Sequence, residues 1–514
     1  MSNTIRAAGA RGTRPASGPA GGGPARHRGL ALILVLLAQL LVVIDVSIVT
    51  LALPAIQRGL GFSPAGLQWV ISGYALAFGG FLLLGGRLAD LLGRRKILIA
   101  GAALFTAASL GCGLAGSAGM LVAARAAEGL GAAMMAPAAL SLILAMFPEG
   151  PERNKALGAF GAVSGAGGAI GVLAGGMLTT WLSWSWIFFV NLPVGTLIVA
   201  GARPLLSESR ADLGHRRFDV AGAVTVTAGL SLLVYAVVTA AGHGWASVTT
   251  IGLLAGAAAL IAAFTVIEAR SAAPLLPLSF FRNRTVTAAN LAGLLLGGLM
   301  FPMFVFLSLY MQQVLGYSAI RAGLAFLVIA AGIIASSGLA QGLVTRTGAK
   351  VVLTAGLLGF AAAQVLFHRL PVAGTFAADL LPGFVIVAVA LGLAFVGDLI
   401  ASAIGVRPAD AGLASGLINT SQQIGGAVGL AVTTTVATAR TTTLLHAGHP
   451  LASALTSGFH DVFGITGALA LAAALVAAAL MGRTRQAGPA AGQPASTARG
   501  EAARAPEPGD RDER

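Results

Sequence analysis

The chain has 514 residues, of which 56% are hydrophobic and only 10% are charged, and its mean hydropathy is +0.87. Soluble globular proteins carry about 25% charged residues, so this composition excludes a chain of soluble domains. The formal net charge of +14 does not indicate nucleic-acid binding, because the basic residues lie mainly in the loops and tails between apolar segments.

Apolar segments of about 20 residues follow one another along the chain, and each is long enough to cross a bilayer core about 30 Å thick. The fourteen predicted spans are 30–52, 67–88, 97–116, 120–144, 158–180, 186–205, 219–241, 248–268, 286–312, 320–343, 350–368, 380–403, 412–437 and 461–482. The stretch LALPAIQRGLG (51–61) is expected to be a loop after the first span. The pattern predicts an all-α integral membrane protein with fourteen transmembrane helices.

An even number of spans places both termini on the same side of the membrane, and the positive-inside rule says which side. With both termini inside, the inward segments hold 27 of the 32 basic residues and the outward loops hold four. We therefore expect a multi-pass protein of the inner (plasma) membrane with cytoplasmic termini. Residues 1–28 and 484–514 are rich in Gly, Pro, Ala and Arg, which predicts disordered cytoplasmic tails.

Two similar loops divide the chain into halves. GGRLADLLGRRK (85–96) lies between the second and third spans, and the weaker QGLVTRTGAK (341–350) lies between the tenth and eleventh. If the loops are equivalent, 29–205 is an N-terminal six-helix bundle and 286–483 is a C-terminal one. Residues 206–285 then hold two inserted helices with cytoplasmic linkers. Paired six-span repeats with a site at their interface are a transporter architecture.

Several stretches, in their joint order, are distinctive. They are IDVSIVTLALP (44–54), GGRLADLLGRRK (85–96), RAAEGLGAA (125–133), GAGGAIGVLAGGML (165–178), WSWIFFVNLPVG (184–195), LYMQQVLGYSAIRAGLAFL (309–327) and AGLASGLINTSQQIGGAVGLAV (411–432). Together they resemble the major facilitator superfamily, and specifically its fourteen-span drug:proton antiporter branch of multidrug efflux transporters. Val172 stands where that pattern usually has a proline, and Ser185 where an arginine is common.

Four ionisable residues lie inside predicted spans, where each costs about 2.5–3.5 kcal/mol and is a functional candidate. Asp45 is expected to face a cavity between the halves as a proton acceptor, because desolvation favours a neutral carboxyl group; an ion pair with a neighbouring helix is the alternative. Arg125 and Glu128 are three residues apart on one helical face and could pair. The resemblance implies a proton relay at Arg125. Asp398 has no counterpart in the resemblance and is either a second proton or cation site or a helix-end charge.

The loop at 85–96 is the candidate conformational latch. The spacing of Asp90, Arg94 and Arg95 allows ion pairs across the loop and between the halves. With Gly86 and Gly93, the resemblance implies that these residues latch an outward-facing state; the alternative is a set of solvated topology charges.

The remaining candidates are small or neutral. Gly167, Gly171, Gly175 and Gly176 are the glycines of the antiporter motif, expected to let helices pack closely where the halves rock. Asn419, Gln422 and Gln423 could hydrogen-bond a substrate without demanding a charge, or could join helices. The sequence contains no Walker-type phosphate loop and no cluster that suggests a metal site.

These features predict a proton-coupled antiporter that exports small hydrophobic drugs or toxic compounds by alternating access, with cationic compounds left open. An exporter of one endogenous metabolite or self-made antibiotic is the first alternative, and a non-transporting membrane sensor or scaffold is the second. We expect no enzymatic activity, cofactor or metal. The expected partners are a small-molecule substrate, protons and the lipid bilayer, with no nucleic acid, and the expected state is a monomer.

Overall fold

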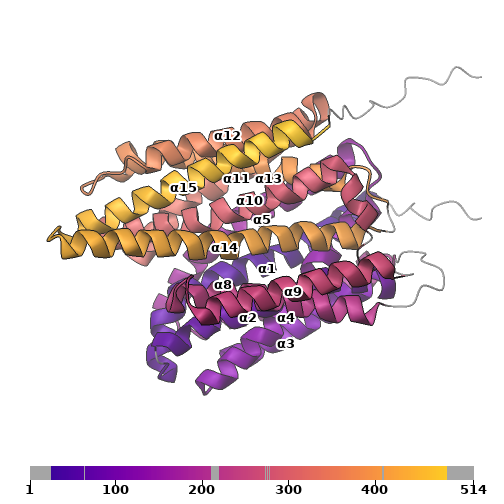
Figure 1. The fold of residues 1–514 in the computed structure, drawn as a ribbon. Coiled ribbons are helices and arrows are strands. Elements are labelled where there is room, and N and C mark those ends of the chain that lie inside the picture. The colour runs from indigo at the N-terminus through magenta and orange to yellow at the C-terminus, as the bar shows by residue number, and fades with distance from the viewer. Residues whose placement is uncertain are drawn as a thin grey trace, which may run out of the picture.

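The computed structural model describes residues 25–62, 64–209, 219–271, 274, 276, 278–407 and 410–482. Within these residues every regular element is a helix (Figure 1), which confirms the predicted all-α class. The predicted tails lie outside the described residues, except that the first helix begins at Ala25, inside the range predicted as tail.

Two bundles and an inserted pair make up the fold. The N-terminal bundle consists of α1 (Ala25–Leu60), α2 (Pro64–Leu92), α3 (Arg94–Gly113), α4 (Ala118–Met146), α5 (Pro151–Trp181), α6 (Trp186–Phe189) and α7 (Asn191–Leu205). The inserted pair is α8 (Val220–His243) and α9 (Val248–Arg270). The C-terminal bundle consists of η1 (Leu278–Arg282), α10 (Arg284–Leu309), η2 (Tyr310–Val314), α11 (Ala319–Thr347), α12 (Ala349–Phe367), η3 (Phe376–Leu380), α13 (Leu381–Ala403), α14 (Ala411–His446) and α15 (Leu451–Leu480).

The number of membrane spans agrees with the prediction of fourteen. By length and composition, 13 helical segments of the described chain could cross a bilayer, and α6 and α7 together form one of them. The helix that fails this composition test is α14, whose Asn, Gln and Thr side chains lower its hydropathy. It is 36 residues long and packs along α10, α15 and α2, so it occupies the place of the thirteenth span.

The prediction of a loop at 51–61 is wrong, because α1 continues to Leu60. Ala52 and Ile56 are fully buried in an apolar cluster with Phe188. Burial of these extra residues, about two helical turns, against the end of the N-terminal bundle keeps the chain helical beyond the predicted boundary.

The bundles meet along a few helices. α5 packs between α1 of its own bundle and α11 of the other, and α14 reaches across to α2 and α4. The inserted helix α8 packs against α9, α2 and α14, so the inserted pair flanks the junction on one side (Figure 1).

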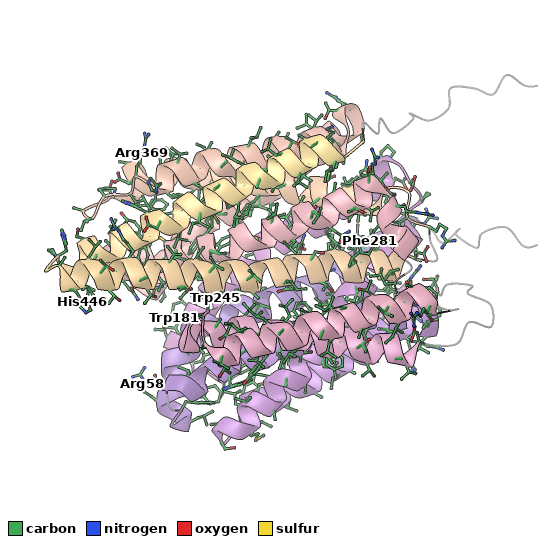
Figure 2. The ribbon with its side chains drawn as sticks, in the orientation of Figure 1. Arg58, Trp181, Trp245, Phe281, Arg369 and His446 are labelled. Atoms are coloured by element: carbon green, nitrogen blue, oxygen red, sulfur yellow. The ribbon has the colours of Figure 1, made fainter. Side chains whose placement is uncertain are left out.

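One end of the molecule is called the tail end (Figure 1). At this end α2, α4 and α15 finish and α14 begins. Arg58, Trp181, Arg369 and His446 lie at the opposite end (Figure 2).

Candidate functional site: a central cavity and three buried acidic centres

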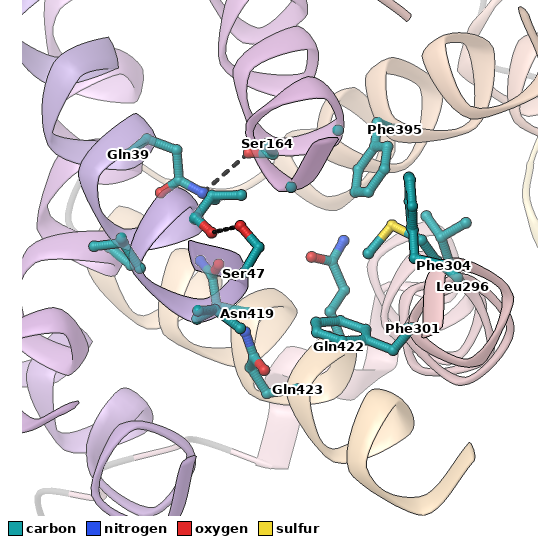
Figure 3. A pocket seen from close by; sticks show the side chains of 18 of the residues that line it. Gln39, Ser47, Ser164, Leu296, Phe301, Phe304, Phe395, Asn419, Gln422 and Gln423 are labelled. Carbon is teal, nitrogen blue, oxygen red and sulfur yellow. Dashed lines mark hydrogen bonds between the residues drawn. The ribbon is translucent and has the colours of Figure 1, made fainter. Parts of the chain in front are cut away.

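A cavity of about 200 Å³ lies between the two bundles. Its wall comes from α1, α2, α4 and α5 on one side and from α10, α13 and α14 on the other (Figure 3). Five phenylalanines contribute to the wall: Phe78, Phe160, Phe301, Phe304 and Phe395. The polar lining groups are all neutral: Gln39, Ser47, Ser164, Ser308, Asn419, Gln422 and Gln423. Among the described residues, therefore, no formal charge faces this cavity.

The three amides predicted to bind substrate, Asn419, Gln422 and Gln423, all lie on this wall. Their role stays a prediction. Sequence reasoning did not single out Gln39, whose Nε2 donates to Oγ of Ser164 across α1 and α5 at 3.0 Å (Figure 3). Gln39 could have been found from sequence, because it is a polar amide within the largely apolar first span.

A buried charge triad, Asp45, Arg125 and Glu128, lies within the N-terminal bundle. Nη1 of Arg125 is 2.7 Å from Oδ2 of Asp45 and 2.7 Å from Oε2 of Glu128. All three side chains are buried. The predicted pairing of Arg125 with Glu128 is confirmed, and Asp45 joins the same cation.

Neutral groups complete the triad. Nδ2 of Asn191 donates to Oδ1 of Asp45 at 3.2 Å and to Oγ of Ser109 at 3.3 Å. Ser109 in turn is hydrogen-bonded to Oε1 of Glu128. The Arg125 guanidinium carbon lies 4.3 Å from the centre of the Tyr74 ring, a cation–π contact. Asn191, Ser109 and Tyr74 were missed from sequence, although Asn191 stands within the quoted stretch 184–195.

The expectation that Asp45 faces the cavity is wrong. Val42, Val43 and Val46 of α1 line the cavity, whereas Asp45 contacts α4 and α7. At about 100° per residue, Asp45 falls on another face of the helix. A buried carboxylate is stable only with a counter-charge and donors, and Arg125 and Asn191 supply them away from the cavity.

Asp398 lies in the last two turns of α13 (Leu381–Ala403) but is fully buried, so it is not a solvated helix-end charge. Its Oδ2 accepts a hydrogen bond from Nε2 of Gln422 at 3.1 Å. Its Oδ1 is buried without a hydrogen-bond partner.

Asp90 joins the two bundles at the tail end. Oδ1 is 2.9 Å from Nη2 of Arg94, which confirms that these residues pair. Oδ1 and Oδ2 also accept the backbone N–H groups of Gly412 and Leu413, each at 2.9 Å. These donors belong to the first turn of α14, where N–H groups lack partners within the helix and favour an anion. A β-carbon added to Gly86 would clash with the Gly412 carbonyl, so the backbones touch here.

The other latch residues bind the linker after α7 instead. Gly93 has φ +114°, a conformation that favours glycine, and a β-carbon there would clash with the Glu208 carboxylate. The backbone N–H of Arg95 donates to Oε1 of Glu208 at 3.2 Å, and its Nε is 3.6 Å from Oε2. Arg95 therefore pairs with Glu208 in the linker after α7, whereas the pairing between the halves is made by Asp90.

Three motif glycines of α5, Gly167, Gly171 and Gly175, face α1, not the other bundle. A β-carbon added to Gly167 would lie 2.8 Å from Cγ1 of Val43, and one added to Gly171 or Gly175 would meet α1 backbone carbonyls. The expectation that these glycines pack where the halves rock is wrong for these three. Gly165, on a neighbouring face, meets Ile333 and Phe395 of the C-terminal bundle instead. α5 is one continuous helix through Val172, which lines the cavity.

Two helical bundles around a central cavity, with charged groups buried inside the spans, define a helical membrane transporter. The sequence pattern of the Major Facilitator Superfamily matches residues 35–430. The chain belongs to this superfamily, and it is a multi-pass transporter of small molecules, not an enzyme.

Named relatives are similar over most of their length. The puromycin resistance protein pur8 of Streptomyces alboniger is 41% identical over 88% of this chain and 89% of its own. The cephamycin export protein CmcT of Amycolatopsis lactamdurans is 43% identical over 79% and 84%. The multidrug resistance protein Stp of Mycobacterium tuberculosis is 35% identical over 78% and 74%.

The crystal structure of the human organic anion transporter MFSD10 is similar in fold. Its TM-score is 0.61 at 17% identity, and the match covers 87% of this chain and 100% of that one.

Proposed function

We propose that this protein is a proton-coupled antiporter that exports small hydrophobic compounds by alternating access. The observation that carries the proposal is the central cavity, which is aromatic, neutral and lined by both bundles. Aromatic walls with a few placed amides suit hydrophobic ligands of varied shape. The names of the relatives, which refer to resistance and export, support the same direction of transport.

Proton coupling is assigned to the charge triad. With both carboxyl groups ionised, the triad carries two negative charges and one positive charge in a buried site. An uncompensated charge in this environment is costly, so the triad binds one proton when no other cation is present. Each proton that enters down 100 mV releases about 2.3 kcal/mol, which drives export without ATP.

The conformational state follows from the assigned topology. We place the termini in the cytoplasm and the chain in the plasma membrane, because 27 of the 32 basic residues fall in the segments that this topology puts inside. Asp90 and the Gly86–Gly412 contact then close the cytoplasmic side, so the structure is the outward-facing or occluded stage of the cycle. The moving bodies are 29–205 and 286–483, with 206–285 between them. Since the residues of one chain line the cavity on both sides, a monomer suffices.

A drug-susceptibility panel in an efflux-deficient host tests the proposal. We expect the intact protein to raise resistance to several chemically unrelated hydrophobic compounds, and Asp45→Asn to abolish that resistance at equal membrane abundance. The matched control is Glu149→Gln, which neutralises an acid that is 64% exposed and should keep full resistance. A wild-type profile identical to the empty host would refute export of these compounds.

The alternative is a dedicated exporter of one endogenous metabolite or self-made antibiotic, and the name of CmcT, which refers to export of a single antibiotic, supports it. The same panel separates the two proposals, because a dedicated exporter would protect against a single compound class.

A further inference from the structure

Whereas the charge triad lies in the N-terminal bundle, Asp398 is buried in the C-terminal bundle. α10 presents Gly293 to it, and a β-carbon there would lie 3.0 Å from Oδ2. α14 presents Ile418 beside Gly293 and the amide of Gln422. The contacts with α12 are made by the preceding residue, Gly397, which packs on Leu353.

Asp398 has no counter-charge among the described residues. Within the described part of the chain, no Lys, Arg or His side chain forms an ion pair with it, and its hydrogen bond comes from the amide of Gln422. Asp45 and Asp90, by contrast, each have an arginine and further N–H donors. An ionised carboxylate that is fully buried with one oxygen unpartnered would be left uncompensated, which costs several kcal/mol. Asp398 therefore holds a proton in this state.

The side chain of Gln422 links Asp398 to the cavity. Gln422 donates to Asp398 and also lines the cavity wall, and its amide projects between Phe301 and Phe395 (Figure 3). Phe395 and Leu399, on the same helix as Asp398, line the wall beside it. A rotation of the Gln422 side chain, which is on the order of nanoseconds for an accessible rotamer, would expose the carboxyl group to a bound compound.

We propose that Asp398 and Gln422 form a site that exchanges one proton for one lipophilic organic monocation. When the cation enters the cavity, Gln422 turns aside, the O–H bond of Asp398 breaks and the proton leaves to water in the cavity. The carboxylate then pairs with the cation, so the site is neutral before and after the exchange. The proposal that this exchange drives transport of the cation rests on the proposed export function. The exchange of a proton for a bound cation does not depend on it. Neutral compounds use the same cavity without Asp398.

Binding of tetraphenylphosphonium to the purified full-length protein tests this exchange, with triphenylphosphine oxide as the neutral probe of similar shape. For the wild type, we expect the affinity for the cation to rise by up to about tenfold per pH unit between about pH 6 and pH 8, because the proton competes for the site. Binding of the cation should release up to about one proton per protein into a weakly buffered solution. The neutral probe should bind independently of pH and release none.

Asp398→Asn should remove both the pH dependence and the proton release for the cation and leave the neutral probe unaffected. Asp398→Glu should restore the proton release. The matched control is Asp461→Asn, which neutralises an acid in α15 that is 41% exposed and should behave as wild type.

Three results would overturn the exchange site: no binding of tetraphenylphosphonium to the wild type, binding without proton release, or an Asp398→Asn variant with an unchanged pH dependence. The first two results are measured with the wild-type protein, so they test the proposal even if the Asp398→Asn variant fails to fold. Failure of the exchange would leave proton-driven transport of neutral compounds intact. Failure of the proposed export function would abolish that transport and leave the binding result standing.

Discussion

At the scale of single residues, the buried carboxyl groups differ in their partners, and this sets their roles. Asp45 and Glu128 share one nitrogen of Arg125, whereas Asp398 has one amide. A shared guanidinium tolerates the loss of either acid, because the remaining pair is still neutral.

A double-mutant cycle measures this sharing. We expect Asp45→Asn and Glu128→Gln each to change the stability of the purified protein little. The combination leaves Arg125 buried without a counter-charge and should cost about 3–5 kcal/mol, read from unfolding in detergent. A double variant whose loss equals the sum of the single losses within about 0.5 kcal/mol would show that the two acids do not share the cation.

The sequence sufficed to find the ionisable residues of the site, since a charge within an apolar span is conspicuous. It did not show where they point. The orientation of Asp45 depends on Arg125, 80 residues away in the chain, and on Asn191, which looks ordinary in sequence. The cavity amides were found in α14, whose polar run stands out, but Gln39 and Ser164 were overlooked as isolated polar residues.

At the scale of helices, the contact between α2 and α14 closes the tail end. Gly86 and Gly412 let the two backbones touch, and Asp90 binds the first turn of α14. This contact joins the bundles only when the tail end is closed. We therefore expect a side chain introduced at Gly86 or Gly412 to favour the state in which the tail end is open.

Gly86→Ala tests this expectation. Overpacking costs about 1–3 kcal/mol, which shifts a two-state equilibrium by about 5- to 150-fold. Ser415, buried in α14 near this contact, can be changed to cysteine, since the only native thiol, Cys112, is buried. We expect Gly86→Ala to speed labelling of Ser415→Cys by a maleimide to a similar extent.

The control is Gly342→Ala in α11, where an added β-carbon meets nothing within 4 Å. Equal labelling rates in the Gly86→Ala and Gly342→Ala backgrounds would mean that the Gly86 contact does not hold the tail end closed.

Helix positions were predictable from hydropathy, because a bilayer imposes both length and composition. Helix ends were less so. α1 runs to Leu60 because Ile56 finds an apolar pocket formed by distant residues, which no local pattern reveals. The packing partner of the α5 glycines was likewise hidden, since glycine spacing predicts close approach without naming the neighbour.

At the scale of the whole molecule, the cavity and the triad occupy different places. The cavity lies between the bundles, and the triad lies within the N-terminal bundle, joined to the cavity wall through α1. Coupling therefore requires that protonation of the triad alters how α1 packs on α4 and α7, and so biases the opening of the bundles.

Uptake of the neutral hydrophobic dye Nile red into inverted membrane vesicles tests coupled export most directly. We predict that an acidic vesicle interior drives uptake by the wild type and that nigericin, which collapses the pH gradient, stops it. Uptake should also fail in Asp45→Asn at equal protein abundance. Uptake that is equal with and without the pH gradient would contradict proton coupling, and absence of protein-dependent uptake would contradict export of neutral hydrophobic compounds.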